Sequence, residues 1–171
     1  ETNKADYGVR IWNPDGSLAE KSGNGLRIFA RWLVDECNAP AQFSVWTDAC
    51  LVHCTVGDTL ISVQMGHAHF RSDEGSISEH LVHDAHTWNA IAVDLGNPHC
   101  VCFYSEKLDT LPWKTWGPLL EHHPRFPHRT NVQFARIVNR KTVEIRIWER
   151  GAGETSASGS SSCAVAAAAV R

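Results

Sequence analysis

WERGAGETSASGSSSC (148–163), followed by AVAAAAV (164–170), is the stretch that decides the fold. A strand leads into it, because Val143, Ile145 and Ile147 alternate with charged residues, the pattern of a half-buried strand. A Gly/Ser-rich turn then ends the strand, and the run of small apolar residues predicts a helix packed tightly on all sides. The helix N-terminus offers backbone N–H groups and the positive end of a dipole, which can hold an anion. Serines that only cap the helix are the alternative at this point.

The composition bounds the class of protein. The chain has 171 residues, 43% of them hydrophobic and 20% charged, with a net charge of −3, enough for one domain or two small lobes. This charge gives no indication of a nucleic-acid partner, and no apolar run is long enough to span a membrane. The six cysteines show no disulfide framework and no signal peptide is visible, so we expect a reducing, cytoplasmic location. Because the chain begins with Glu1 and ends at Arg171 inside an expected helix, we expect both ends to be cut.

A Ser-Gly stretch also opens an earlier helix, predicted over 26–36. Its apolar residues fall on two faces, so we expect the helix to be largely enclosed. Leu26, Phe29, Ala30 and Leu33 form the first face, and Ile28 and Trp32 the second. The chain thus contains the same arrangement twice, at Ser22 and at Ser158, which favours two related lobes.

Strands fill most of the chain between the two Ser-Gly stretches. After a first strand at 7–12 and a turn at 13–17, we expect strands at 42–47, 49–56, 59–65, 87–95 and 100–105, and a hairpin of 130–138 with 142–149. A short helix is expected within 112–121, and the polar stretch 66–78 is the expected crossing between lobes. These elements predict an α+β fold with a first lobe at 1–66 and a second at 67–171.

Five motifs carry a family resemblance. They are IWNPDGS (11–17), SGNGLRIFARWL (22–33), LGNPHCV (95–101), GPLLEHHPRFPHRTNVQF (117–134) and ERGAGET-x-A-x-G (149–159). With these motifs, in family order over nearly the whole chain, the sequence resembles the diaminopimelate epimerases, cofactor-independent amino-acid epimerases of lysine and cell-wall synthesis. The family's opening segment and its closing strands are absent from the resemblance.

The resemblance implies a fold of two pseudo-symmetric lobes, each a mostly antiparallel mixed sheet wrapped around a central helix. It places the active site in the cleft between the lobes, at the two helix N-termini. There one cysteine takes the substrate α-proton as a thiolate, and a second delivers a proton to the opposite face, which interconverts LL- and meso-diaminopimelate. Helix dipoles stabilise the developing charge and lower the thiol pKa from about 8.5 toward neutrality. The resemblance implies a small amino acid as the ligand and no cofactor. It leaves open whether the protein forms a homodimer.

The sequence departs from the family at both acid/base positions, where Ser22 and Ser158 stand in place of cysteine. A hydroxyl is a far weaker acid than a thiol and is a poor base without an activating partner. His99 and Glu149 match the family residues beside the cysteines and are the candidate partners. The loop also reads Gly-Ser-Ser-Ser-Cys where the family usually keeps another Gly and an Ala. This drift favours a natural divergent homologue over an engineered inactive enzyme.

The substrate-holding positions match the family more closely. The residues matching those that hold the non-reacting end of diaminopimelate are Asn13, Asn97, Asn131 and Arg150. Arg150 would pair with the distal carboxylate. The residues expected to give N–H groups to the reacting carboxylate are Gly23, Asn24, Gly159 and Ser160. For each Asn the alternative is a turn residue that uses its side chain locally.

No metal site is predicted. The Cys/His groups at 50–54, 99–102 and 67–69 lack the spacing of a structural zinc site, and Cys163 is expected to be a small core residue. Three hypotheses follow: an epimerase, a non-catalytic binder that keeps the substrate grip, and another isomerisation with Glu149 or His99 as base. Incubation with diaminopimelate in D2O separates them, since only proton abstraction deuterates the α-carbon.

Overall fold

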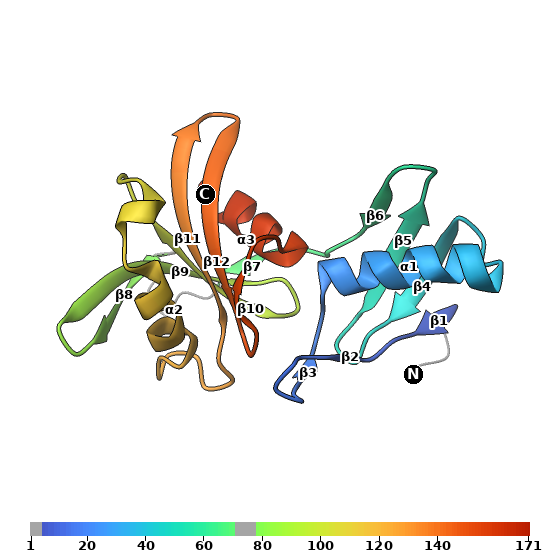
Figure 1. Cartoon of the computed structure of the whole chain (residues 1–171), viewed down its shortest axis with the longest axis horizontal. Coiled ribbons are helices and arrows are strands. Elements are labelled where there is room, and N and C mark those ends of the chain that lie inside the picture. The colour runs from blue at the N-terminus through green and yellow to red at the C-terminus, as the bar shows by residue number, and fades with distance from the viewer. Residues whose placement is uncertain (1–4, 71–77) are drawn as a thin grey trace. The chain divides into compact units, whose positions relative to one another are not determined.

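The computed structural model of the protein describes residues 5–70 and 78–171 (Figure 1). The chain divides after Gly66 into two units, Glu1–Gly66 and His67–Arg171. Each unit combines β-strands with at least one α-helix, and both larger sheets contain parallel and antiparallel pairs. The predicted α+β class is therefore confirmed.

The first unit packs α1 (Gly23–Cys37) against a four-stranded sheet. The sheet has the order β1-β4-β5-β6, made of β1 (Tyr7–Gly8), β4 (Gln42–Trp46), β5 (Leu51–Val56) and β6 (Ile61–Val63). Only β1 runs parallel to its neighbour, β4. Leu26, Ala30 and Leu33 of α1 are buried against the sheet, as their spacing predicts. These contacts fix α1 and hence the position of its first turn.

Two expectations for the first unit are wrong. The strand expected at 7–12 is two short strands, because β1 pairs with β4 whereas β2 (Ile11–Trp12) forms a separate hairpin with β3 (Leu18–Ala19). The second apolar face of α1 is open, with Ile28 72% and Trp32 51% exposed. The sheet covers only one side of the helix, so α1 is not enclosed in this structure.

The second unit is a seven-stranded sheet with a helix on each face (Figure 1). Its order is β13-β12-β11-β10-β9-β7, with β8 also paired to β9. The strands are β7 (His69–Phe70), β8 (Ser78–His83), β9 (His86–Asp94), β10 (Pro98–Phe103), β11 (Asn131–Asn139), β12 (Thr142–Glu149) and β13 (Gly153–Thr155). Among these described strands β10 and β11 run parallel and the other pairs antiparallel. The predicted hairpin is confirmed as β11 and β12.

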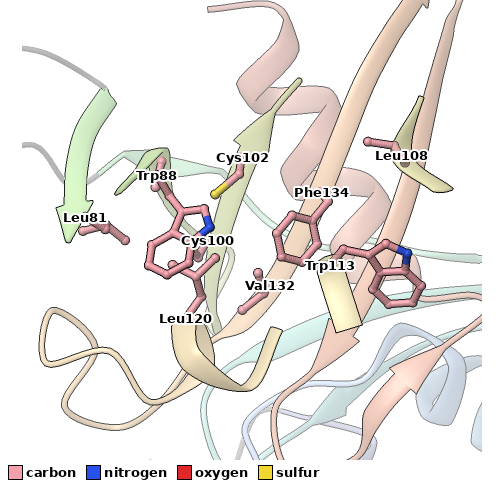
Figure 2. Packing of buried hydrophobic residues seen from close by; sticks show 10 residues of the cluster. Leu81, Trp88, Cys100, Cys102, Leu108, Trp113, Leu120, Val132 and Phe134 are labelled. Carbon is pink, nitrogen blue, oxygen red and sulfur yellow. The ribbon is translucent and has the colours of Figure 1, made fainter. Parts of the chain in front are cut away.

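Strand alternation sorts the side chains of β10 and β11 between the two helices. Cys100 and Phe134 face α2 (Trp113–Glu121), whose Leu120 joins them in one buried cluster (Figure 2). Val101 and Ala135 point to the opposite face, where they pack with α3 (Gly159–Ala169). Odd-numbered residues of these two strands therefore lie on the α3 face.

The covering of α3 is one-sided. Ala164, Val165 and Ala168 are buried against the sheet, whereas Cys163 and Ala166 are exposed. The expectations of a helix packed on all sides and of a core Cys163 are both wrong, because small residues allow close packing on the sheet without requiring it on every side.

A short 3-10 turn, η1 (Leu108–Thr110), precedes α2. Of the predicted crossing at 66–78, residues 71–77 lie outside the described residues. Within the described part of the chain, no helix is both long and apolar enough to cross a membrane.

Candidate active site

In the first unit, the candidate residues gather at the start of α1. The Ser22 hydroxyl caps the helix by accepting a hydrogen bond from the Gly25 N–H at 3.1 Å. Gly23 is buried in the first turn, and the Asn24 side-chain oxygen accepts from Arg27. The preceding Lys21 is buried and its ammonium donates to the Met65 carbonyl at 3.0 Å. Ser22 is thus held by the backbone of the helix that it begins.

Asn13 has a local role in this structure. Its side-chain Nδ2 donates to Ser17 Oγ at 3.0 Å, and its backbone N–H donates to the Ser17 carbonyl at 2.8 Å. Both bonds close the turn between β2 and β3. The alternative that the sequence left open for Asn13, a turn residue that uses its side chain locally, is what these bonds describe.

In the second unit, the start of α3 forms a small polar site. The Ser158 hydroxyl accepts from the Ser161 N–H at 3.4 Å and lies 3.4 Å from the Ser160 hydroxyl. Both the N–H and the hydroxyl of Ser162 donate to the Ser158 carbonyl, at 3.1 and 2.9 Å. Among the described residues, the structure gives no acceptor to the backbone N–H groups of Gly159 and Ser160. Such a helix start attracts an anion such as a carboxylate.

A buried chain of hydrogen bonds connects this helix start to the sheet. Gln133 Nε2 donates to Ser161 Oγ at 3.0 Å and to His99 Nδ1 at 3.1 Å. Since Nδ1 accepts, the proton of neutral His99 is on Nε2, which donates to Asn97 Oδ1 at 3.0 Å. Gln133 Oε1 is buried and has no hydrogen-bond partner in the described part of the chain. These hydrogen bonds thus fix both the tautomer of His99 and the orientation of the Asn97 side chain.

The pKa of His99 is lowered from its ordinary 6.5 to about 4, and burial of the ring is the main cause. The hydrogen bond from Gln133 and the Asp94 carboxylate oppose this shift, whereas the Arg150 guanidinium adds to it. His99 is therefore neutral near pH 7 with both ring nitrogens engaged. In the described contacts it bonds to Asn97 and Gln133 and not to Ser158.

Asn131 and Arg150 are joined through the backbone. Asn131 Oδ1 accepts from the Arg150 N–H at 3.1 Å, and its Nδ2 donates to the Pro98 carbonyl at 2.9 Å. The Arg150 guanidinium donates to the His128 carbonyl at 3.3 Å and its side chain is largely buried. Gly151 follows with a φ of 73°, which turns the chain back toward β13. Asn131 therefore ties the start of β10 to the turn after β12.

Glu149 ends β12 on the α3 face, because it lies an even number of residues from Val143 and Ile145, which pack in the α3 cluster. Its backbone carbonyl accepts from Ala152 N–H at 3.1 Å. In the described contacts its carboxylate has no hydrogen bond or ion pair, and it is only half-buried. Of the two candidate bases in the second unit, Glu149 is therefore the one whose titratable group is not engaged in a described hydrogen bond.

The structure thus connects most of the candidate residues of the second unit by hydrogen bonds. In the first unit, Ser22, Gly23 and Asn24 lie at the start of α1, and Asn13 lies in the turn between β2 and β3. Sequence reasoning missed several buried polar residues of the second unit, among them Gln133, Ser161 and Glu121. Strand periodicity could have found Gln133, since it is two residues from Asn131 and shares its face. Glu121 is a charged residue after an apolar helical stretch, and its partners are too distant in sequence to be found by spacing.

Comparisons with known proteins show which family this chain is similar to. The family model described as diaminopimelate epimerase matches residues 91–171. The chain is 43% identical over 179 residues to diaminopimelate epimerase 2 of Nostoc sp., covering 98% of this chain and 62% of the relative. It is 41% identical over 174 residues to the diaminopimelate epimerase of Pseudomonas syringae pv. tomato, covering 96% of this chain and 63% of the relative. The chain thus spans less than two thirds of these curated relatives.

A solved structure shows a similar fold. The phenazine biosynthesis protein of the PhzF family from Bacillus anthracis matches with a TM-score of 0.63 and 14% identity, over 96% of this chain and 62% of that one. At this identity the likeness concerns the fold alone.

Proposed function

This chain belongs to the diaminopimelate epimerase family, and we propose that it carries a site for interconverting LL- and meso-diaminopimelate by α-proton transfer without a cofactor. In this proposal the isomerase acts in the cytoplasm, in lysine and cell-wall precursor synthesis. Proton transfer is slow, because hydroxyls occupy both acid/base positions. The observation that supports the proposal is the hydrogen bonding of the second unit. Asn97 is connected through His99 and Gln133 to Ser161 at the start of α3, and Asn131 is bonded to the backbone of Arg150.

The reacting carboxylate is assigned to the helix starts. The N–H groups of Gly159 and Ser160 have no acceptor among the described residues, and α3 adds the positive end of its dipole. Gly23 and Asn24 are assigned the same role at α1. This placement stabilises the charge that develops at the α-carbon when its proton leaves.

The distal end of the substrate is assigned to Arg150 with Asn97 and Asn131. A buried guanidinium offers several N–H donors and pairs well with a carboxylate. His99 positions Asn97 through the 3.0 Å hydrogen bond and is not a base in this proposal, since its pKa of about 4 and its two engaged nitrogens leave it unable to accept a proton near pH 7. Asn13 is the weakest member of the set because its side chain already closes a turn.

Ser22 and Ser158 are proposed to be the proton-transfer positions, with reduced power. Each hydroxyl accepts a hydrogen bond from its own helix, and among the described contacts no base accepts its proton. Glu149 is the remaining candidate to activate Ser158, since it lies on the α3 face and its carboxylate has no hydrogen bond or ion pair among the described contacts.

A second candidate function is a binder that keeps the substrate grip without turnover. Among the described contacts no base reaches Ser158, which favours it. Both functions predict that the chain binds meso-diaminopimelate and that Arg150→Ala weakens binding by about 1–3 kcal/mol, because the distal carboxylate loses its partner.

Calorimetric titration with meso-diaminopimelate followed by incubation in D2O tests the proposal. Binding together with slow α-deuteration supports the epimerase, and binding without any deuteration assigns the chain to the binder. If neither the starting chain nor Arg150→Ala binds diaminopimelate, both candidate functions are contradicted. Arg150→Lys is the matched control, which keeps the charge and loses the planar fork of donors.

A further inference from the structure

Glu121 is a buried carboxylate that none of the assigned roles uses. It ends α2 and is only 4% exposed. A negative charge at a helix C-terminus faces the negative end of the dipole, and burial of a charge is costly without strong donors. This location is therefore unfavourable for a carboxylate unless its hydrogen bonds offset both costs.

The bonds of Glu121 reach both sides of the Glu149–Arg150 pair. Oε2 accepts from the Trp148 indole N–H at 2.8 Å, directly before the pair. Oε1 accepts from the Gly151 backbone N–H at 3.0 Å, directly after it. One carboxylate thus connects the end of β12 and the turn that follows to the end of α2. The two residues in between cannot shift without breaking one of these bonds.

The same carboxylate also supports the loop that contacts Arg150. Oε1 accepts from the Arg129 guanidinium at 3.3 Å, and the Glu121 backbone carbonyl accepts from Thr130 N–H at 3.2 Å. The neighbouring His128 carbonyl accepts from the Arg150 guanidinium at 3.3 Å. Glu121 therefore fixes the backbone of Arg150 from one side and the acceptor of its side chain from the other.

We propose that Glu121 is a positioning residue that fixes Glu149 and Arg150 in the geometry needed to bind the amino-acid substrate. The inference rests on the proposed function and adds to it a residue outside the substrate contacts. The substitution Glu121→Gln would keep the shape of the side chain, but one carboxylate oxygen would become an NH2 group, which cannot accept a hydrogen bond. The donors that now share the carboxylate would then lose an acceptor. The turn at Gly151 would loosen, and Arg150 would lose its fixed position.

The test compares Glu121→Gln with Glu144→Gln. Glu144 is a matched control because it lies on the same strand, β12, and accepts from Arg136 at 2.9 Å, away from the Gly151 turn. We expect Glu121→Gln to accelerate hydrogen exchange of the Gly151 amide and of the Trp148 indole N–H, and to weaken binding of meso-diaminopimelate about tenfold. Glu144→Gln leaves both unchanged within about twofold. In the Arg150→Ala background, Glu121→Gln has no further effect on binding, because it acts through Arg150.

Several results would overturn the inference. If Glu121→Gln accelerates exchange at Gly151 without changing affinity, the role of Glu121 is structural only. An equal loss of affinity with and without Arg150 shows that it does not act through that residue. Trp148→Phe, which removes one bond and keeps the other two, is the second variant if Glu121→Gln does not fold, and unchanged affinity there contradicts the inference. A starting chain that does not bind diaminopimelate overturns the proposed function together with this inference, whereas affinity that depends on Arg150 and not on Glu121 overturns this inference alone.

Discussion

Burial keeps His99 neutral over most of the pH range in which enzymes act. Its ring is 1% exposed, one nitrogen accepts from Gln133, and the other donates to Asn97. Protonation would put a proton on Nδ1, where Gln133 now donates, and would place a cation near Arg150. His99 is therefore a structural support of Asn97 whose loss of neutrality disturbs the site.

The pKa of His99 predicts how stability depends on pH. Because the folded pKa is about 4 and the unfolded value is near 6.5, the unfolded chain binds more protons between these values. Stability contributed by neutral His99 is thus fully present above about pH 6.5 and is lost as the pH falls toward 4, by about 3 kcal/mol in total. Urea denaturation between pH 4 and 7 measures it.

His99→Gln removes this titration and should flatten the decline in that pH range. His80→Gln is the control, because His80 is exposed on β8 of the same unit. If the starting chain and His99→Gln lose stability with the same slope, His99 is not buried in the neutral form described.

Trp148 joins three elements of the second unit. Its ring lies so close to Gly117 of α2 that a Cβ at that position would be 2.7 Å from it, and it also packs beside Gly153 of β13. Its indole N–H donates to Glu121. The close approach of α2 to β12 therefore depends on Gly117 having no side chain.

Gly117→Ala should destabilise the chain by about 1–3 kcal/mol, although Ala is the better helix former by about 1 kcal/mol. The added methyl group would clash with Cβ, Cγ and Cδ2 of Trp148. These atoms are close to the backbone of β12 and cannot move away without disturbing that strand. Urea midpoints measure the change, and the same substitution in a Trp148→Val background is the control. A Gly117→Ala variant that is more stable than the starting chain contradicts the packing described.

The two serine caps should differ in strength. Ser22 accepts from Gly25 at 3.1 Å, whereas Ser158 accepts from Ser161 at 3.4 Å, a long bond. We expect Ser22→Ala to cost about 1 kcal/mol and Ser158→Ala less, within the usual range for N-caps of about 0.5–2 kcal/mol. Thermal melts followed by circular dichroism compare them, with Ser22→Gly as a milder control. Equal costs would show that the longer bond is as strong as the shorter one.

At the level of elements, sequence periodicity predicts what depends on local neighbours. The alternation of Val143, Ile145 and Ile147 identified β12, and the spacing of Leu26 and Leu33 identified the buried face of α1. Long-range contacts decide the rest. The exposure of Ile28 depends on which side of α1 the sheet covers, and periodicity does not encode that.

The candidate site divides in the same way. Motifs located the serines at both helix starts, and the structure has each as an N-cap. The local bonds of Asn13 were expected only as an alternative, and the neutral state of His99 was not predicted, because both depend on side-chain geometry. The supporting residues Gln133 and Glu121 were missed, since their partners come from different strands and helices.

For the whole molecule, the central claim is that a carboxylate-binding site remains and that the two acid/base atoms limit the reaction. Restoring both thiols, Ser22→Cys with Ser158→Cys, should then raise α-proton exchange strongly, since each acid–base group contributes about 10²–10⁴-fold. Either single replacement should help much less, because the pair acts as a unit.

The most direct measurement is α-deuterium uptake into diaminopimelate in D2O by four proteins: the starting chain, the two single variants and the double variant, each with its folding checked by circular dichroism. The account predicts that the double variant exchanges at least about a hundredfold faster than the starting chain, with both single variants far below it. A folded double variant that exchanges no faster than the starting chain would contradict the central claim.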